Sequence, residues 1–441
     1  MTLIQLTPGA GGMYCGNCFR DNALVAALRR LGHDTVMVPL YLPMTLDESP
    51  TVESTPTFFG GINVYLDQHL AWYRHAPGWL RRMADSPALL RWAAGKAAKT
   101  RASDVGELTV SMLLGERGNQ ARDLEELTGW LQHVPSPGAV FLSNALLAGF
   151  ARRLRETLGC PVVCFLQSEE TFLDSMEDRW RTRAWQTLRD RVGDVDLWVS
   201  PSQYFADRMA SRLGLDPARI RIVPNGILLE GYDALPERRA KKPGDPITLG
   251  YFARMCADKG LDLVVDAFLV LRSGGRHPNL RLRIGGGCGP GDEGFVAELR
   301  QRLVSAGLES AVSLHPNVSR EEKIAFYAAC DVLSVPSRMS ESFGLYLVES
   351  LAAGTPLVQP DVSAFGEVLA DTAGGMLYGP NTSDALATAL EPLLTDPARL
   401  ASLGAAGRAA VQSRYSDTAM ARRTVTALRS LGLNLPEPAS G

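Results

Sequence analysis

The chain has 441 residues, of which 46% are hydrophobic and 21% charged, a composition typical of a globular protein with sizeable cores. At roughly 100–200 residues per domain, this length accommodates two or three domains. The formal net charge of −3 provides no general attraction to nucleic acid or anionic lipid, so we expect no nucleic-acid partner and only local basic sites.

The N-terminal sequence MTLIQLTPGAGG lacks the basic region and the long apolar stretch of a signal peptide. No apolar run reaches the length of about 18 residues that a transmembrane helix needs, so we expect none. The seven cysteines are an odd number and do not indicate a disulfide framework. Together these features predict a cytoplasmic protein.

Short apolar runs alternate with longer helical patterns along the chain. A first series of expected strands lies at 3–6, 35–40, 139–143, 161–166, 197–200 and 220–223. A second series lies at 247–252, 280–284, 312–315, 332–335 and 356–358. Such alternation predicts parallel sheets that helices cover on both faces. We therefore expect an α/β protein with doubly wound, Rossmann-like domains, whose ligands bind at the carboxyl ends of the strands.

The charged segment LPERRAKKPGDP at 235–246 contains three prolines and separates the two series of strands. We interpret it as a linker between an N-terminal domain at 1–240 and a C-terminal domain at 245–415. Residues 416–441 are expected to form a helix and a tail that return to the N-terminal domain. The cleft between two such domains is the default ligand site.

Residues 43–135 interrupt the alternation with helix-like patches and contain Trp72, Trp79, Trp92 and Trp130. One interpretation is a helical insertion whose aromatic side chains pack onto the first domain. A second is an acceptor-binding lobe, because aromatic faces suit the C–H faces of sugars. A third is a membrane-surface patch, which leaves a peripheral membrane contact open.

The stretch SESFGLYLVES at 340–350 places Glu341 in a loop and Glu349 inside a predicted helix, for which Gly354 supplies the C-terminal cap. The first backbone amides of that helix, at 343–345, face the carboxyl end of the preceding strand and make an anion site. Two carboxylates beside such a site suit the vicinal hydroxyls of a sugar. The alternative is a solvated helix face that carries two unrelated charges.

The stretch GYFARMCADKGLDLVVDAF at 250–268 places Arg254 and Lys259 in a loop, between a predicted strand and a helix that starts near Gly260. Two cations at a strand end, beside a helix N-terminus, fit a diphosphate. The alternative is two surface cations on a connecting loop.

In this order and spacing, the two stretches resemble the retaining glycosyltransferases of family 4, the glycogen-synthase-like group 1 enzymes. Further matching pieces are VPNGI, RIGGGCGPGDE, SESFGLYLVESLAAGTPLV and the tail GGMLYGPNTSDALATALEPLLTDPARLASLG. The resemblance is dense over 196–415 and looser over the first 40 residues. It implies the GT-B fold, in which two Rossmann-like domains face each other across a cleft.

The resemblance also implies a role for each matching residue. Arg254 and Lys259 would hold the donor diphosphate and stabilise the leaving nucleotide. Glu341 would bind donor-sugar hydroxyls, and with Arg254 and Lys259 it would make up the implied catalytic set. Glu349 would bind the ribose hydroxyls. The other implied donor contacts are Gly11, Gly12, Phe343, Gly344 and Leu345. Asn317 and Val318 fall where such enzymes contact the base.

The implied activity is transfer of a hexosyl unit from a nucleotide-diphosphate sugar to a carbohydrate or glycosylated small-molecule acceptor. Retention is expected through front-face attack, without a metal or another cofactor. A UDP-sugar is the commonest donor in the family. The rival readings are a GT-B phosphorylase, which would use a sugar 1-phosphate, an epimerase, and a non-catalytic nucleotide-sugar-binding protein.

The glycine loop GGMYCGNCFRDN at 11–22 departs from the family pattern, because Cys15 and Cys18 precede or open the helix. The two cysteines are interpreted as loop-shaping residues, as a redox pair or as half of a zinc site. Asn17, between them, is a candidate acceptor contact.

A second departure lies where many relatives carry a histidine, because this chain has Gln167 followed by Ser168, Glu169 and Glu170. Gln167 and Glu169 are candidate acceptor contacts, and one interpretation of Glu169 or Glu170 is a base for the acceptor. The alternative is an acidic pair that only stabilises a helix start. The sequence DVD at 194–196 runs into a buried strand, so we expect no metal site there.

Overall fold

The computed structural model describes residues 1–9, 16–41, 58–59, 66, 73, 76–77, 105–237, 240–242 and 244–435. The chain divides into two compact units, Met1–Pro224 with Met420–Gly441, and Asn225–Ala419. The first unit therefore ends before the charged segment at 235–246, which was expected to be the linker. Tyr232 lies in the core of the second unit, so the residues just after Pro224 pack with that unit.

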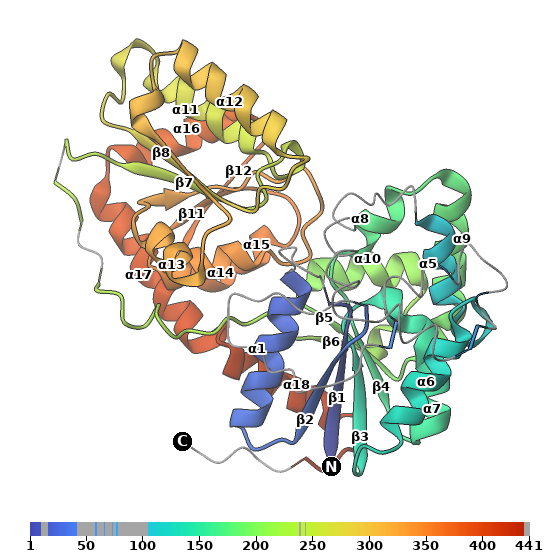
Figure 1. The fold of residues 1–441 in the computed structure, drawn as a ribbon. Helices are drawn as coiled ribbons and strands as arrows, with labels where there is room; N and C mark the ends of the chain where they lie inside the picture. The colour runs from blue at the N-terminus through green and yellow to red at the C-terminus, as the bar shows by residue number, and fades with distance from the viewer. Residues whose placement is uncertain are drawn as a thin grey trace. The chain divides into compact units, whose positions relative to one another are not determined.

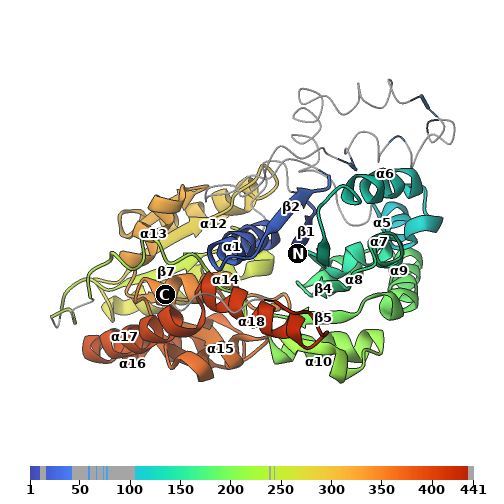
Figure 2. The ribbon, with the colours of Figure 1, turned by 90° about the horizontal axis from the view of Figure 1, so that it is seen from below.

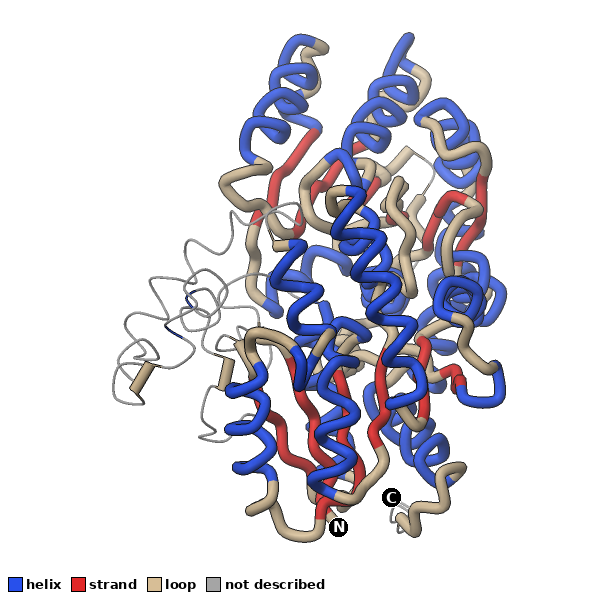
Figure 3. The backbone as a smooth tube through the Cα atoms, turned by 90° about the vertical axis from the view of Figure 1, so that its right-hand side faces the viewer, coloured by secondary structure: helices blue, strands red, loops and turns tan. Residues whose placement is uncertain are grey.

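The first unit contains a six-stranded parallel sheet in the order β2-β1-β3-β4-β5-β6. Its strands are β1 (Thr2–Thr7), β2 (Thr35–Pro39), β3 (Pro137–Leu142), β4 (Val162–Phe165), β5 (Leu197–Ser200) and β6 (Ile220–Ile222). Each overlaps one of the strands expected from an apolar run, so the first series is confirmed. Figure 3 shows these strands side by side between helices, with the N-terminus at one end of the sheet.

Helices cover both faces of this sheet. Leu3 and Ile4 point to opposite faces, as successive strand residues do, and belong to separate apolar clusters. The face of Leu3 is covered by α1 (Gly16–Arg30) and α18 (Asp417–Arg429). The face of Ile4 is covered by α5 (Gly106–Leu113), α6 (Ala121–Leu131), α7 (Ala151–Leu158), α8 (Glu169–Asp174), α9 (Asp178–Arg191) and α10 (Gln203–Leu213). Figure 2 shows α1 and α18 on one side of the strands and α6, α7 and α9 on the other. Short 3-10 turns are η3 (Gly115–Arg117), η4 (Ala145–Phe150), η5 (Val192–Asp194) and η6 (Pro217–Arg219).

The described part of the 43–135 insertion packs onto the first unit through aromatic rings. Phe59 stacks on Phe150 with ring centroids 4.9 Å apart, and Phe58 lies 5.4 Å from Trp130. Trp130 is also partly buried against the apolar core of this unit, which supports the packing interpretation for Trp130. The other three tryptophans of the insertion lie outside the described residues, and the acceptor-lobe and membrane-surface interpretations stay predictions.

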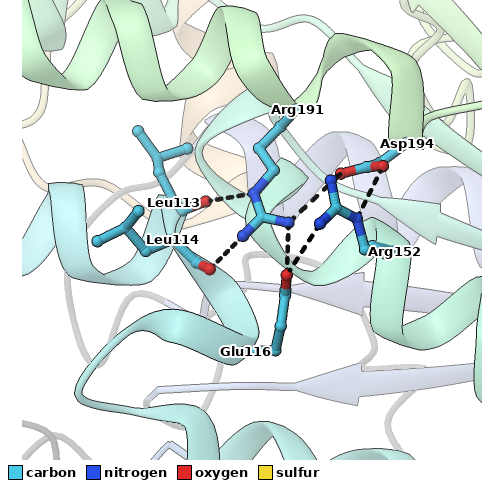
Figure 4. Close-up of polar contacts among 6 residues, drawn as sticks. All are labelled: Leu113, Leu114, Glu116, Arg152, Arg191 and Asp194. Carbon is cyan, nitrogen blue, oxygen red and sulfur yellow. Dashed lines mark hydrogen bonds and ion pairs between the residues drawn. The ribbon is translucent and has the colours of Figure 1, made fainter.

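A buried ionic cluster joins α5, α7 and α9 on the same side of the sheet (Figure 4). Arg191 is fully buried and donates to the carbonyl of Leu113, at the end of α5, and to the carbonyl of the next residue. Arg191 also contacts Glu116 at 3.1 Å and Asp194 at 3.4 Å, and Arg152 binds the same two carboxylates. The carboxylate of Asp194, the first residue of the DVD motif, is therefore used to hold helices together.

The second unit contains another six-stranded parallel sheet, in the order β12-β11-β10-β7-β8-β9. Its strands are β7 (Thr248–Phe252), β8 (Arg281–Gly286), β9 (Val312–Pro316), β10 (Val332–Leu333), β11 (Leu357–Pro360) and β12 (Gly375–Tyr378). The first five overlap the expected second series. The edge strand β12 was not predicted, because it is short and begins with a glycine.

Helices again cover both faces of the sheet (Figure 1). One face carries α11 (Leu261–Arg272), α12 (Glu293–Ser305) and α16 (Ser383–Leu394). The other carries α13 (Arg320–Ala328), α14 (Leu345–Ala352), α15 (Phe365–Thr372) and α17 (Pro397–Arg414). The 3-10 turns are η7 (Ala257–Lys259), η8 (Ser273–Gly275) and η9 (Glu309–Ala311). None of the helices in the described ranges combines the length and the apolar character needed to cross a bilayer.

The strand order determines where a ligand-binding crevice is expected at the edge of each sheet. In the second unit, β8 lies on one side of β7 and β10 on the other, so the chain reverses its direction of travel at β7. The loops that follow β7 and β10 therefore diverge at the carboxyl ends of the strands, and ligands of such sheets bind in the crevice between those loops. The corresponding point of the first sheet lies between β1 and β3.

Candidate functional site

An ion pair spans the switch point of the second unit. Lys259 ends η7, in the loop after β7, and Glu341 lies in the loop between β10 and α14. The Lys259 ammonium contacts Oε1 of Glu341, and the two side chains are 23% and 10% exposed. The main chain of Glu341 is fixed by Ser363, whose hydroxyl accepts from its N–H at 3.1 Å. The predicted cation and the predicted carboxylate thus meet, 82 residues apart in sequence.

Arg254, the second predicted cation, is held by a carboxylate that nothing in the sequence pattern singles out. Its Nε and Nη2 donate to the two oxygens of Asp292 at 3.1 and 3.0 Å. Asp292 is nearly buried and also accepts from the backbone N–H of Gly289, in the glycine-rich loop after β8. The bond to Asp292 raises the pKa of Arg254, so the guanidinium stays charged. Arg254 itself remains 65% exposed and open to an anion.

The helix that follows Glu341 begins as the sequence predicts. Gly344 adopts φ 86° and precedes the first residue of α14, Leu345. Leu345 and Tyr346 open α14 in the loop after β10, and the first amides of a helix have no earlier helical carbonyl to bond, which suits an anion. The ring of Phe343 is buried and lies 6.0 Å from Tyr415, so only the backbone of Phe343 is available for a donor. The donor contacts of these three residues stay predictions.

Both oxygens of Glu349 are engaged by donors from α13. Lys323 Nζ lies 2.9 Å from Oε1, and the hydroxyl of Tyr327 donates to Oε2 at 2.9 Å. Lys323 and Tyr327 are one helical turn apart and therefore share a face of α13. Both predicted glutamates are largely buried and paired, so neither is a solvated surface charge. Their shared role in sugar binding stays a prediction.

Asn317 uses its side chain to join two loops at the carboxyl end of the sheet. Its amide accepts from the N–H of Cys288 at 2.9 Å and donates to the carbonyl of the same residue at 2.8 Å. The side chain is thus committed to the protein backbone. Contact of Asn317 and Val318 with the base stays a prediction.

The predicted contacts of the first unit are only partly described. Gly11, Gly12 and Cys15 lie outside the described residues. Asn17 is partly exposed in the first turn of α1, and Cys18 is fully buried, so its thiol faces the core. The roles proposed for these residues stay predictions.

Glu169 is buried and ties two loops of the first unit together. Its two oxygens accept from the backbone N–H groups of Ala145 and Gln167, each at 2.8 Å. Burial raises the pKa of Glu169 to about 7. Glu170, next to it in the first turn of α8, lies 3.3 Å from Arg208. The position is that of an acidic helix start, and acceptor contact by Glu169 or by the partly exposed Gln167 stays a prediction.

The second carboxylate of the DVD motif also has a structural partner. Asp196 accepts from the backbone N–H of Val162 at 2.8 Å and lies 3.6 Å from Arg155. Among the described residues, no group of three His, Cys, Asp or Glu side chains is arranged to hold a metal ion.

Comparison with known families matches both units. The model for "Glycosyltransferase Family 4" covers residues 110–230, and the model for "Glycosyl transferases group 1" covers residues 236–410, which contain the ion pairs described above. The chain belongs to glycosyltransferase family 4. The expected family is thereby confirmed, and the two parallel sheets agree with the expected GT-B architecture of two Rossmann-like domains.

Individual relatives of this family 4 chain match it over part of its length. A D-inositol 3-phosphate glycosyltransferase of Kineococcus radiotolerans is 35% identical over 44% of this chain and 47% of that protein. A GDP-mannose-dependent alpha-(1-6)-phosphatidylinositol monomannoside mannosyltransferase of Mycolicibacterium smegmatis is 29% identical over 51% of this chain and 59% of that protein. The match thus spans about half the length of the curated relatives.

Solved structures share the fold of this family 4 chain along almost all of its length. Sucrose-phosphate synthase from Thermosynechococcus elongatus superimposes with a TM-score of 0.69 at 18% identity, covering 98% of this chain and 99% of that one. Anabaena HepE in complex with UDP gives a TM-score of 0.65 at 16% identity, covering 98% and 100%. At such identities the likeness establishes the GT-B fold.

Proposed function

We propose that this protein is a retaining glycosyltransferase that moves a hexosyl unit from a nucleotide-diphosphate sugar to a carbohydrate or glycosylated small-molecule acceptor. The observation that carries the proposal is the Lys259–Glu341 pair across the switch point of the second sheet, with Arg254 following the same strand. Two cations and a helix N-terminus at one strand edge suit a diphosphate better than any neutral ligand.

In the free protein each of the two cations is paired with a carboxylate, Lys259 with Glu341 and Arg254 with Asp292. A donor diphosphate competes for both cations, since it brings its own negative charge to the same place. Binding would then free an oxygen of Glu341 to accept hydrogen bonds from hydroxyls of the donor sugar. The site thus exchanges internal ion pairs for ligand contacts instead of exposing bare charges.

The proposed chemistry relies on positioning and on neutralising charge. The acceptor hydroxyl attacks the anomeric carbon on the face from which the diphosphate leaves, and the bond from that carbon to the phosphate oxygen breaks. The acceptor proton passes to the leaving phosphate, whose negative charge Arg254 and Lys259 stabilise. A divalent metal is not required in this scheme, because the two cations serve the leaving group.

Glu349 is suited to the ribose of the nucleotide. Each of its oxygens already accepts one protein donor, from Lys323 or Tyr327, which fixes the plane of the carboxylate. Each oxygen retains a further lone pair, and a pair of vicinal hydroxyls matches that spacing.

The donor base and the acceptor are proposed from the relatives. HepE was solved with UDP and with UDP-glucose, and one relative is named as GDP-mannose-dependent. We favour a UDP-sugar, with a GDP-sugar as the alternative. Several relatives are named for D-inositol 3-phosphate, which supports a polyhydroxylated acceptor. The cytoplasmic location and a peripheral membrane contact stay predictions.

The first test is thermal stabilisation by UDP, GDP, ADP and their common hexose conjugates. A ligand at about 100 times its Kd should add roughly 2.7 kcal/mol of stability. Stabilisation by one nucleotide supports the proposal and identifies the base. No response to any nucleotide, together with a response to a sugar 1-phosphate, would instead favour a phosphorylase.

The second test is transfer itself, with the selected donor and a panel of polyol and sugar acceptors, followed by NMR of the product. Retention of the anomeric configuration, unchanged in the presence of EDTA, supports the proposed mechanism. Inversion would contradict it, and loss of activity with EDTA would contradict the metal-independent scheme. Conversion of the donor sugar without an acceptor would indicate an epimerase, and binding without turnover a non-catalytic protein.

A further inference from the structure

We propose that Arg338 is a positioning residue for Lys259 and acts through a clamp that it forms with Asp262. This inference deepens the proposed function, on which it rests, by naming the group that sets the geometry of the diphosphate-binding lysine. Arg338 lies in the loop after β10, and Lys259 lies in the loop after β7. These two strands are neighbours at the switch point of the sheet.

Arg338 is bonded to the loop of Lys259 from both its side chain and its main chain. Its Nη1 and Nη2 donate to the two oxygens of Asp262, in the first turn of α11, both at 2.7 Å. Nη1 also donates to the carbonyl of Ala257, and the backbone N–H of Arg338 donates to the carbonyl of Asp258 at 2.8 Å. Arg338 is therefore bonded to two residues before Lys259, Ala257 and Asp258, and to one residue after it, Asp262.

A close backbone approach locks the other side of Lys259. Gly260 adopts φ 74°, and a Cβ added to it would lie 2.1 Å from the carbonyl oxygen of Pro336. The β7–α11 loop thus rests directly on the β10–α14 loop at Gly260 and is bonded to it at Asp258. Lys259 lies between these two anchors, so the direction of its side chain toward Glu341 is set by the backbone on both sides.

The contacts also explain why Arg338 itself is assigned no phosphate-binding role. Both Nη atoms of Arg338 are bonded within the clamp, Nη1 to Asp262 and to the carbonyl of Ala257 and Nη2 to Asp262. Arg254, by contrast, bonds Asp292 through Nε and Nη2. A lysine at 338 would keep the charge but lose the fork, and it would not hold Asp262 and Ala257 at the same time. The expected effect of Arg338 is therefore indirect, through the position of Lys259.

The test is a double-mutant cycle read by isothermal titration calorimetry with UDP and, separately, with GDP. The variants are Arg338→Gln, Lys259→Ala and the double variant, with thermal unfolding of each recorded in parallel. We expect Arg338→Gln to weaken binding of the preferred nucleotide about 10-fold, and the double variant to bind no more weakly than Lys259→Ala alone. Asp262→Asn removes the partner and leaves Arg338 in place, and we expect it to reproduce the loss.

Arg300→Gln is the matched control, because Arg300 forms an exposed ion pair with Glu309 in the same unit, at 2.9 Å. We expect this variant to bind as wild type does. Losses that add independently in the double variant would overturn the clamp, as would wild-type binding by both Arg338→Gln and Asp262→Asn. The proposed function fails separately, if the wild-type protein binds none of UDP, GDP and ADP.

Discussion

The hydroxyl of Tyr327 donates a hydrogen bond to Glu349 at 2.9 Å, from the neighbouring helix and over 22 residues of sequence. With Lys323 on the other oxygen, this bond removes the freedom of the carboxylate to rotate. The proposed ribose site is therefore assembled before a nucleotide arrives, and the cost of ordering the carboxylate falls on folding and not on binding.

Removal of that hydroxyl should weaken nucleotide binding modestly. We expect Tyr327→Phe to lose up to about 1.5 kcal/mol of binding free energy. The variant loses a hydrogen bond to a charged carboxylate, which only orients that group for the ribose, while the ring still packs. Calorimetry with UDP and with 2′-deoxy-UDP separates the ribose effect, since the variant should discriminate less between the two. Tyr41→Phe, in the other unit, is the control, and an equal loss there would contradict the assignment.

The two cations should be required for turnover. Lys259→Ala and Arg254→Ala are each expected to lower turnover by about 10²-fold or more, since each removes a charge that stabilises the leaving diphosphate. Transfer from the preferred nucleotide sugar is the measurement. Arg276→Ala is the control, because Arg276 pairs with Glu391 on the exposed surface of the same unit. Normal turnover in either site variant would remove it from the proposed catalytic set.

Glu169 should make the stability of the protein depend on pH near neutrality. Burial raises its pKa from 4.5 to about 7, so between these values the folded protein holds a proton that the unfolded chain has released. Stability therefore falls as pH rises from about 4.5 to about 7 and levels off above that range. The shift corresponds to about 3 kcal/mol as an upper limit.

The measurement for Glu169 is the melting temperature of wild type and of Glu169→Gln at intervals from pH 5 to pH 8. Glutamine resembles the protonated acid and does not titrate. The melting temperature of the wild type should therefore fall relative to that of the variant as pH rises. A constant difference between the two proteins across this range would show that Glu169 does not titrate there.

Loss of Arg191 should lower the free energy of unfolding of the first unit by several kcal/mol. Arg191→Met leaves Glu116, Asp194 and the carbonyls at the end of α5 without their buried donor. Breaking a buried ion pair from one side typically costs about 3–5 kcal/mol. Arg153→Met is the matched control, because its pair with Glu125 is exposed and is expected to contribute less than about 1 kcal/mol. Thermal unfolding of both variants is the measurement. An equally small destabilisation of the two would contradict a stabilising role of the cluster.

The sequence predicted most strands because each is a short apolar run between helical patterns, as in β5, whose observed bounds coincide with the expected ones. It failed at β12, where an edge strand of four residues lacks a comparable run. The sequence of a single strand does not show whether its pairing is parallel. The long helical connections between successive strands indicate it, because parallel strands need such crossovers.

The proposed site was predictable where residues sit in local motifs and unpredictable where they pair at long range. Glu341 and Glu349 were found because a loop and a helix start are readable over a few residues. Asp292 and Arg338 were not, since their partners lie 38 and 76 residues away and no spacing connects them. The side-chain bonds of Asn317 were equally unpredictable, since they join it to the backbone of Cys288, 29 residues away.

Helix α18 packs its residues from Met420 onward against the same apolar cluster as Leu3 and Phe141. During synthesis, the whole of the second unit leaves the ribosome before α18 can cover its share of this face, which until then only α1 covers. The first unit must therefore keep part of its apolar surface open while the second unit is made. A chain that stops before Met420 would retain every strand of both sheets and still expose that surface to aggregation or to chaperones.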